Sequence, residues 1–185
     1  MEDKCSRRQE VILNTVIGIL DSTEYSKFTI EEVASRAGVG KSTIYRWWGH
    51  KSDLVFDAFK QQTSSVFYLD FTKTLEANLI LQLQKLSHVL HQGVGRALLV
   101  AMAERREAAG LFFQQYLLPR REQTRKLIQV AIQREEIKAE YPFELMLDTL
   151  YAPIHYHIIF FNRIPSENYI HELVQMVLAP VRLSK

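Results

Sequence analysis

A short stretch of the chain gathers side chains that suit the binding of a polyanion. From Val33 to Ser52 there is no Asp or Glu, while the cations are Arg36, Lys41, Arg46 and Lys51. The same stretch holds one tyrosine and two adjacent tryptophans, whose O–H and N–H groups can donate to phosphate oxygens. Because acidic and basic residues balance over residues 1–65, the charge of this region is polarised, not in excess. Such a basic face provides the phosphate contacts of nucleic-acid binding.

The elements that must position this face are predicted to be two short helices joined by a glycine turn. Thr29, with Glu32 three residues later, forms a capping-box pattern that begins the first helix. Gly38 can adopt a positive φ after that helix, and Gly40 is a tolerated cap for a second helix over residues 41–48. This is the helix-turn-helix pattern, whose second helix enters the DNA major groove.

The second helix is expected to have one face for packing and one for DNA. Ile44 and Trp48 share the packing face. The small and basic residues of the other face are candidates for contacts with base edges, and these are Lys41, Ser42 and Arg46. Guanine is the base that Lys and Arg prefer.

Four further side chains are expected to hold backbone phosphates. Tyr45 and Trp47 would donate from an O–H and an indole N–H. Thr29 would act through the helix dipole, and Lys51 through its charge. A purely structural alternative remains, in which the tryptophans are core and the cations are solvated surface.

The whole fold is predicted to be all-α. Apolar residues recur at helical spacing, and seven Gly and five Pro among 185 residues leave few turns. A first helix is expected over about residues 6–21, with a buried stripe of Ile12, Val16, Ile19 and Leu20. Pro119 should kink the third of the later helices. Those later helices are expected at about residues 75–91, 94–106, 108–136, 143–161 and 166–179.

The segment FTIEEVASRAGVGKSTIYRWWGHKSDLVFDAF (residues 28–59) resembles the DNA-binding head of the TetR family of bacterial transcription regulators. Over roughly the first third of the chain, the resemblance implies a small helical head that binds DNA. It gives phosphate-contact roles to Thr29, Thr43, Tyr45 and Lys51, and base contacts to Lys41, Ser42 and Arg46. The sequence departs from the family pattern in the loop TEYSK, which lacks a Gly, and at Gly40, which replaces the commoner Ser cap.

The remaining two-thirds resemble the family more weakly, through LFFQQYLLPRREQTRKLIQVAIQREEI (residues 111–137). This resemblance implies a helix-turn-helix domain at residues 6–66, with its motif at about residues 29–48, and an effector-binding and dimerisation domain at residues 67–185. The last two helices would form the homodimer interface, through Leu147, Ile154, Ile158, Phe161, Leu173 and Val177. These apolar stripes could instead face only the chain's own core.

The later part of the chain is also rich in aromatic residues, which suit a pocket for an apolar or aromatic small-molecule effector. Any one of them could equally be ordinary core. The candidates for lining such a pocket are Phe71, Phe112, Phe113, Tyr116, Tyr151 and His155.

Other classes of function find little support. Because no catalytic cluster, phosphate-binding glycine loop or metal spacing is recognisable, we expect neither an enzyme nor a cofactor or metal. No apolar run approaches the roughly 18 residues of a membrane span. The single Cys5 cannot form an internal disulfide, which favours a cytoplasmic protein.

The sequence therefore predicts a homodimeric, small-molecule-responsive regulator that binds a near-palindromic double-stranded DNA operator, with repression as the expected effect. The alternative is a non-catalytic helical adaptor whose basic head binds an acidic protein.

Overall fold

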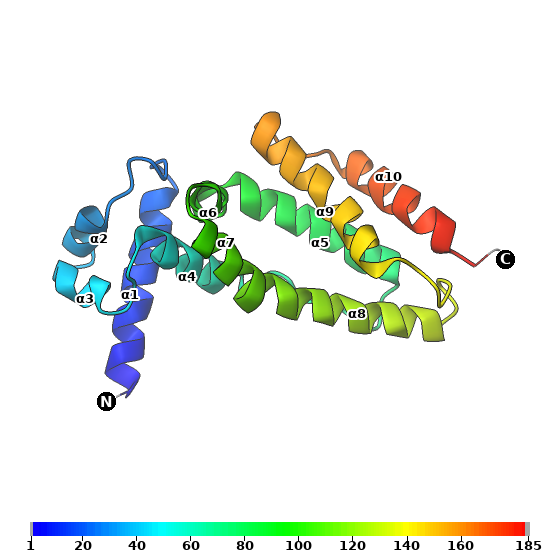
Figure 1. The fold of residues 1–185 in the computed structure, drawn as a ribbon, viewed down its shortest axis with the longest axis horizontal. Coiled ribbons are helices and arrows are strands. Elements are labelled where there is room, and N and C mark those ends of the chain that lie inside the picture. The colour runs from blue at the N-terminus through cyan, green and yellow to red at the C-terminus, as the bar shows by residue number, and fades with distance from the viewer. Residues whose placement is uncertain (1, 184–185) are drawn as a thin grey trace. The chain divides into compact units, whose positions relative to one another are not determined.

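The computed structural model describes residues 2–183, with side chains from residue 7 onward, so the Cys5 side chain lies outside the described residues. Within this range the secondary structure is helical, apart from an isolated antiparallel bridge between Ile137 and Arg182 (Figure 1). The all-α prediction is confirmed.

The chain divides into two compact units. The first comprises residues 1–65 and 92–116, and the second comprises residues 66–91 and 117–185. The first break falls beside the predicted boundary between residues 66 and 67. However, residues 92–116 join the first unit, because the helix that begins at Gly93 packs against helices of the N-terminal region.

The first unit is built around three helices that pack on one another, α1 (Glu2–Leu20), α4 (Lys51–Thr63) and α6 (Gly93–Glu104). Two short helices, α2 (Ile30–Arg36) and α3 (Lys41–Tyr45), pack against each other, and α2 also packs against α1. The predicted apolar stripe of α1 is confirmed, since all four of its side chains are buried. This core supports α3, which is too short to be stable by itself.

The predicted single helix over residues 108–136 is three elements. These are α7 (Arg106–Phe112), a π-helical segment (Phe113–Leu117) and α8 (Leu118–Gln133). The three elements follow one another without a break, since Leu117 has helical φ and ψ, and the π-helical turn lies directly before Pro119, which has no N–H to donate. The predicted helical run is therefore present, with an irregularity beside Pro119 in the form of a π-helical turn, and it covers residues 106–133 instead of 108–136.

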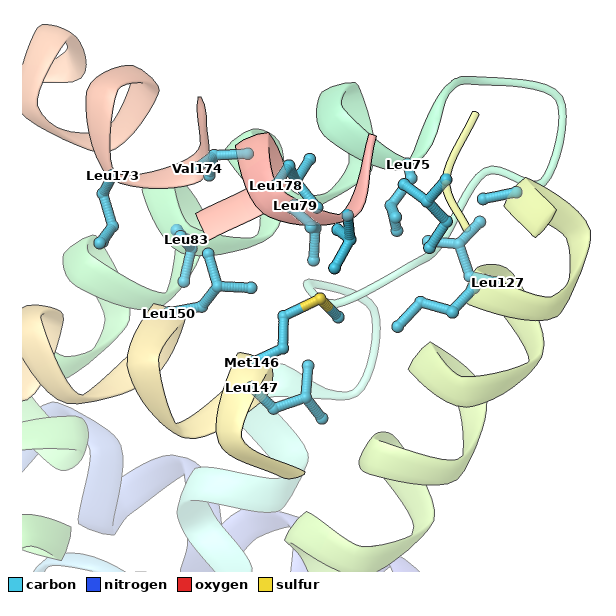
Figure 2. Close-up of a cluster of buried hydrophobic side chains, with 14 of the residues drawn as sticks. Leu75, Leu79, Leu83, Leu127, Met146, Leu147, Leu150, Leu173, Val174 and Leu178 are labelled. Carbon is cyan, nitrogen blue, oxygen red and sulfur yellow. The ribbon is translucent and has the colours of Figure 1, made fainter. Parts of the chain in front are cut away.

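The second unit contains α5 (Leu75–His91), α8, α9 (Phe143–Phe160) and α10 (Glu167–Leu178). Helices α5, α9 and α10 pack pairwise, and α8 packs against α5. Their facing sides contribute a cluster of buried apolar side chains, including Leu79, Leu83, Leu127, Leu150 and Leu173 (Figure 2). Burial of these side chains is the main force that holds the four helices together.

Replacement of Leu83 by alanine should destabilise the protein markedly. Leu83 is fully buried in this cluster, so we expect Leu83→Ala to lower the free energy of unfolding by about 2–5 kcal/mol. Leu81→Ala is the matched control on the exposed side of the same helix, and should cost less than about 1 kcal/mol. Urea unfolding followed by circular dichroism measures both. Equal effects of the two substitutions would contradict the packing described.

Candidate nucleic-acid interface

The turn between α2 and α3 is formed by a side-chain cap and a glycine. The Thr29 hydroxyl accepts a hydrogen bond from the Glu32 N–H at 3.3 Å, which caps α2. Gly38 has a φ of +65°, which lets the chain turn so that the Val39 N–H donates to the Ala34 carbonyl at 3.0 Å. Only half of the predicted capping box is formed, because the Glu32 carboxylate pairs with Arg36 at 2.7 Å.

Helix α3 buries one face and exposes the other. Ile44 is 0% exposed and Trp48 is 4% exposed, which confirms their assignment to packing. Of the residues of α3 and its last turn that were predicted to contact DNA, the exposed ones are Lys41, Ser42, Tyr45 and Arg46, and the half-buried ones are Thr43 and Trp47. Tyr45 is 50% exposed although it is aromatic. The helix itself ends at Tyr45, and the N–H groups of Trp47 and Trp48 both donate to the Ile44 carbonyl in the turn that follows.

Acidic residues lie closer to this basic face than the sequence indicates. The Lys41 ammonium is 2.9 Å from the Glu31 carboxylate, which belongs to the first turn of α2. The hydrogen bond from Lys41, above all, lowers the pKa of Glu31. Both side chains are more than half exposed, so the pair holds Lys41 only weakly. Phosphate groups can therefore compete with Glu31 for this cation.

The two tryptophans have different environments. The Trp48 indole N–H donates to Asp57 Oδ2 of α4 at 2.8 Å, which fixes the end of the α3 segment to α4. The Trp47 ring packs edge-on against Trp48, with 5.6 Å between the ring centroids. The Arg46 guanidinium lies 5.2 Å from the Trp47 centroid, so cation–π attraction orients this cation while it stays exposed.

Lys51 is half-buried at the start of α4. Its ammonium donates to the Tyr25 carbonyl at 3.2 Å and lies 4.1 Å from the centroid of the Tyr25 ring. Burial, and then the nearby Glu104 carboxylate, raise the pKa of Tyr25 to about 12. Lys51 thus connects the loop before α2 to α4. A phosphate contact by Lys51 stays a prediction, which the remaining N–H groups of the ammonium permit.

The predicted effector-pocket residues fall in both units. In the first unit, Phe112 and Tyr116 stack at 5.0 Å between ring centroids and pack edge-on against Phe56 and Phe59 of α4. Phe113 belongs to the same unit and is exposed.

The other predicted pocket residues, Phe71, Tyr151 and His155, belong to the second unit. The Tyr151 hydroxyl donates to Gln82 Oε1 at 2.8 Å, and burial raises its pKa. His155 Nδ1 lies 2.9 Å from the Tyr151 carbonyl. Phe71 is exposed, and its carbonyl accepts a hydrogen bond from Arg134. Their role in effector binding stays a prediction.

Most of the predicted dimer-contact residues lie in the chain's own core. Leu147, Ile154 and Ile158 are at most 1% exposed, and Leu173 is also buried. These four side chains therefore pack in the core of a single chain, and their part in a dimer interface stays a prediction. Phe161 is exposed and Val177 is half-buried, so both stay candidates.

A helix pair of this geometry, with a buried apolar side and an exposed basic side on its second helix, defines a helix-turn-helix DNA-binding protein. Residues 20–58 match the family model described as bacterial regulatory proteins, tetR family. Residues 70–177 match the model described as tetracyclin repressor-like, C-terminal domain. The chain belongs to the TetR family of transcription regulators.

Similar proteins agree with this assignment. The chain is 24% identical to the HTH-type transcriptional regulator YdeS of Bacillus subtilis, over 89% of this chain and 85% of that protein. It is 26% identical to the HTH-type transcriptional regulator Rv1556 of Mycobacterium tuberculosis, over 95% and 88% of the two chains. The crystal structure of the TetR-family regulator SCO0332 superposes with a TM-score of 0.76 at 22% identity, covering 95% of this chain and 99% of that one.

Among the helices that the structure describes, none combines the length and the apolar composition that a bilayer crossing requires.

Removal of the Glu31 carboxylate should strengthen binding to DNA of any sequence. Glu31→Gln frees Lys41 and removes a charge that repels phosphates, so we expect roughly two- to fivefold tighter binding to a random duplex at low salt. Fluorescence anisotropy at several salt concentrations measures this change. Glu10→Gln, an exposed acid on α1, is the matched control for net charge. An equal gain in both variants would argue against a specific Glu31–Lys41 effect.

Proposed function

We propose that this TetR-family regulator acts as a homodimer that represses transcription from a near-palindromic operator and releases it when a small apolar or aromatic effector binds. The observation that carries the proposal is the exposed polar and basic face of α3. Burial of Ile44 and Trp48 leaves Lys41, Ser42 and Arg46 on the surface. Lys41 and Ser42 lie at the N-terminus of α3, where the residues of a recognition helix approach base edges, and Arg46 follows its last residue with a side chain long enough to reach them.

The DNA contacts that we propose fall into two kinds. Lys41, Ser42 and Arg46 contact base edges and so specify sequence. The residues that contact phosphates and so fix the orientation of α3 on the duplex are Thr29, Thr43, Tyr45, Trp47 and Lys51. The cation–π contact with Trp47 restrains Arg46 before DNA binds.

A second copy of the chain is proposed to cover the exposed side of α9. Leucine, isoleucine and aromatic side chains point outward there at helical spacing, which is unusual for a helix face in water. The exposed stripe comprises Leu145, Thr149, Ala152, Tyr156, Ile159 and Phe160. Exposed Phe161 lies 5.1 Å from Tyr156 between ring centroids and extends the stripe. A dimer places two α3 helices on one duplex, which matches the two-fold symmetry of a palindromic operator.

The proposed effector is a small apolar or aromatic molecule. The aromatic side chains around Phe112 and Tyr116, and the polar groups of Tyr151 and His155, are of the kinds that line sites for small apolar molecules. Release of DNA requires that the effector bind the form of the protein that cannot bind DNA more tightly than the form that can. By linkage, DNA must then weaken effector binding by the same factor.

Substitutions of two α3 residues should separate sequence reading from phosphate binding. We expect Lys41→Ala to lose preference for duplexes that the wild-type protein selects from a random pool, because a base contact is lost. Tyr45→Phe should weaken selected and random duplexes alike, because only a phosphate contact is lost. Anisotropy titrations at several salt concentrations test both. If the wild-type protein shows no salt-dependent DNA binding, the DNA role fails and an acidic protein becomes the expected partner.

A charge on the exposed stripe of α9 should prevent dimer formation. Phe160 is 71% exposed, so Phe160→Asp leaves the fold intact but places a carboxylate in the proposed interface. Sedimentation velocity should show a dimer for the wild-type protein and a monomer for the variant. Leu118→Asp, at an exposed apolar position on α8, is the matched control and should stay dimeric. A Phe160→Asp protein that remains dimeric would place the interface elsewhere.

A further inference from the structure

Arg105 occupies a backbone position shared by two helices of the first unit. It lies between α6 and α7, with φ −129° and ψ 108°. Its N–H donates to the Ala101 carbonyl at 3.0 Å, which ends α6. Its carbonyl accepts from the Ala108 N–H at 3.1 Å, which begins α7. The position of this residue is therefore fixed by both helices.

The Arg105 side chain reaches the N-terminal turn of α4. Its guanidinium donates to Ser52 Oγ at 2.9 Å and to Asp53 Oδ1 at 2.7 Å. Ser52 is buried, with 2% of its surface exposed, and the two partners of the ion pair are each less than a third exposed. Glu107 lies farther away, at 3.7 Å, and is mostly exposed. The contact with α4 is thus the shorter and more sheltered of the two ion pairs.

Asp53 extends this contact toward the recognition helix. Its second oxygen, Oδ2, accepts a hydrogen bond from the His50 N–H at 3.2 Å, in the turn that joins the α3 segment to α4. The neighbouring Lys51 ammonium is held by the carbonyl and the ring of Tyr25. One carboxylate therefore joins the α6–α7 junction to the turn that follows the proposed DNA-contacting residues.

We propose that Arg105 is a positioning residue for DNA recognition: through Ser52 and Asp53 it sets the orientation of the turn after α3, and hence the fit of α3 to its operator. The inference rests on the proposed DNA-binding function. It assigns no contact between Arg105 and DNA. Both hydrogen bonds come from one nitrogen, Nη1, whose N–H groups are fixed in the guanidinium plane, whereas the N–H groups of an ammonium rotate freely.

The test compares Arg105→Met with Arg106→Met, which removes an exposed cation one residue along the chain. Dissociation constants are measured in the full chain for a duplex selected by the wild-type protein and for a scrambled duplex of equal length. We expect Arg105→Met to weaken binding of the selected duplex by about tenfold, as for other coupled polar contacts, with little change for the scrambled one. Arg106→Met should leave the dissociation constants for both duplexes close to the wild-type values. In the Arg105→Met background, Asp53→Asn should cause no further loss, because the contact is already broken.

Hydrogen exchange at single amides distinguishes a local change at the turn after α3 from a general loss of stability. The His50 amide should exchange faster in Arg105→Met, while amides in the centre of α1 keep their protection. If Arg105→Met does not fold, Arg105→Lys replaces it, since it retains the charge but loses the planar Nη1 donor and the full length of the arginine side chain. The same loss of preference is expected for it, and wild-type preference would overturn the proposal.

Two further outcomes overturn this role while the proposed function stands: wild-type preference in Arg105→Met, or an equal loss on both duplexes, which would indicate a direct phosphate contact. A wild-type protein that binds neither duplex overturns the proposed function itself, and this role with it.

Discussion

The burial of Ile44 and Trp48 is the constraint on which the DNA-contacting surface depends. Helix α3 has five residues, and a helix of that length does not persist in water without tertiary contacts. Its orientation therefore comes from the two buried side chains and from the hydrogen bond between the Trp48 indole and Asp57 of α4. With that side fixed, geometry alone presents the opposite side of α3 to the solvent.

The contacts around α3 also prepare its cations for a polyanion. Lys41 is held by an exposed carboxylate, and Arg46 by an aromatic ring, so both are restrained but remain accessible. The exposed pair costs little to break, and an indole ring does not compete with phosphate for hydrogen bonds. The surface is thus ordered before binding, which reduces the entropy lost when DNA is bound.

Local signals in the sequence predicted the parts of the fold that local physics determines. The Thr29 cap, the positive φ of Gly38 and the packing side of α3 follow from residues a few positions apart. The break at Arg105 lies within a few residues of the predicted boundary between helices at residues 94–106 and 108–136, and the π-helical turn ends two residues before Pro119. The contact of the Arg105 side chain with Ser52 and Asp53 carries no local signal, because the partners are more than 50 positions apart in the sequence. In α9 apolar residues occur on all sides, so periodicity could not tell the core-facing stripe from the exposed one. The Glu31–Lys41 pair was missed because it joins two helices across the turn.

Amide hydrogen exchange of the full chain, with and without a selected duplex, tests most directly whether α3 contacts DNA. We predict that the duplex slows exchange at residues 41–48 and around the Thr29 cap, and leaves the exposed stripe of α9 unchanged. Slower exchange elsewhere, with residues 41–48 unaffected, would contradict the assignment of α3 as the recognition helix.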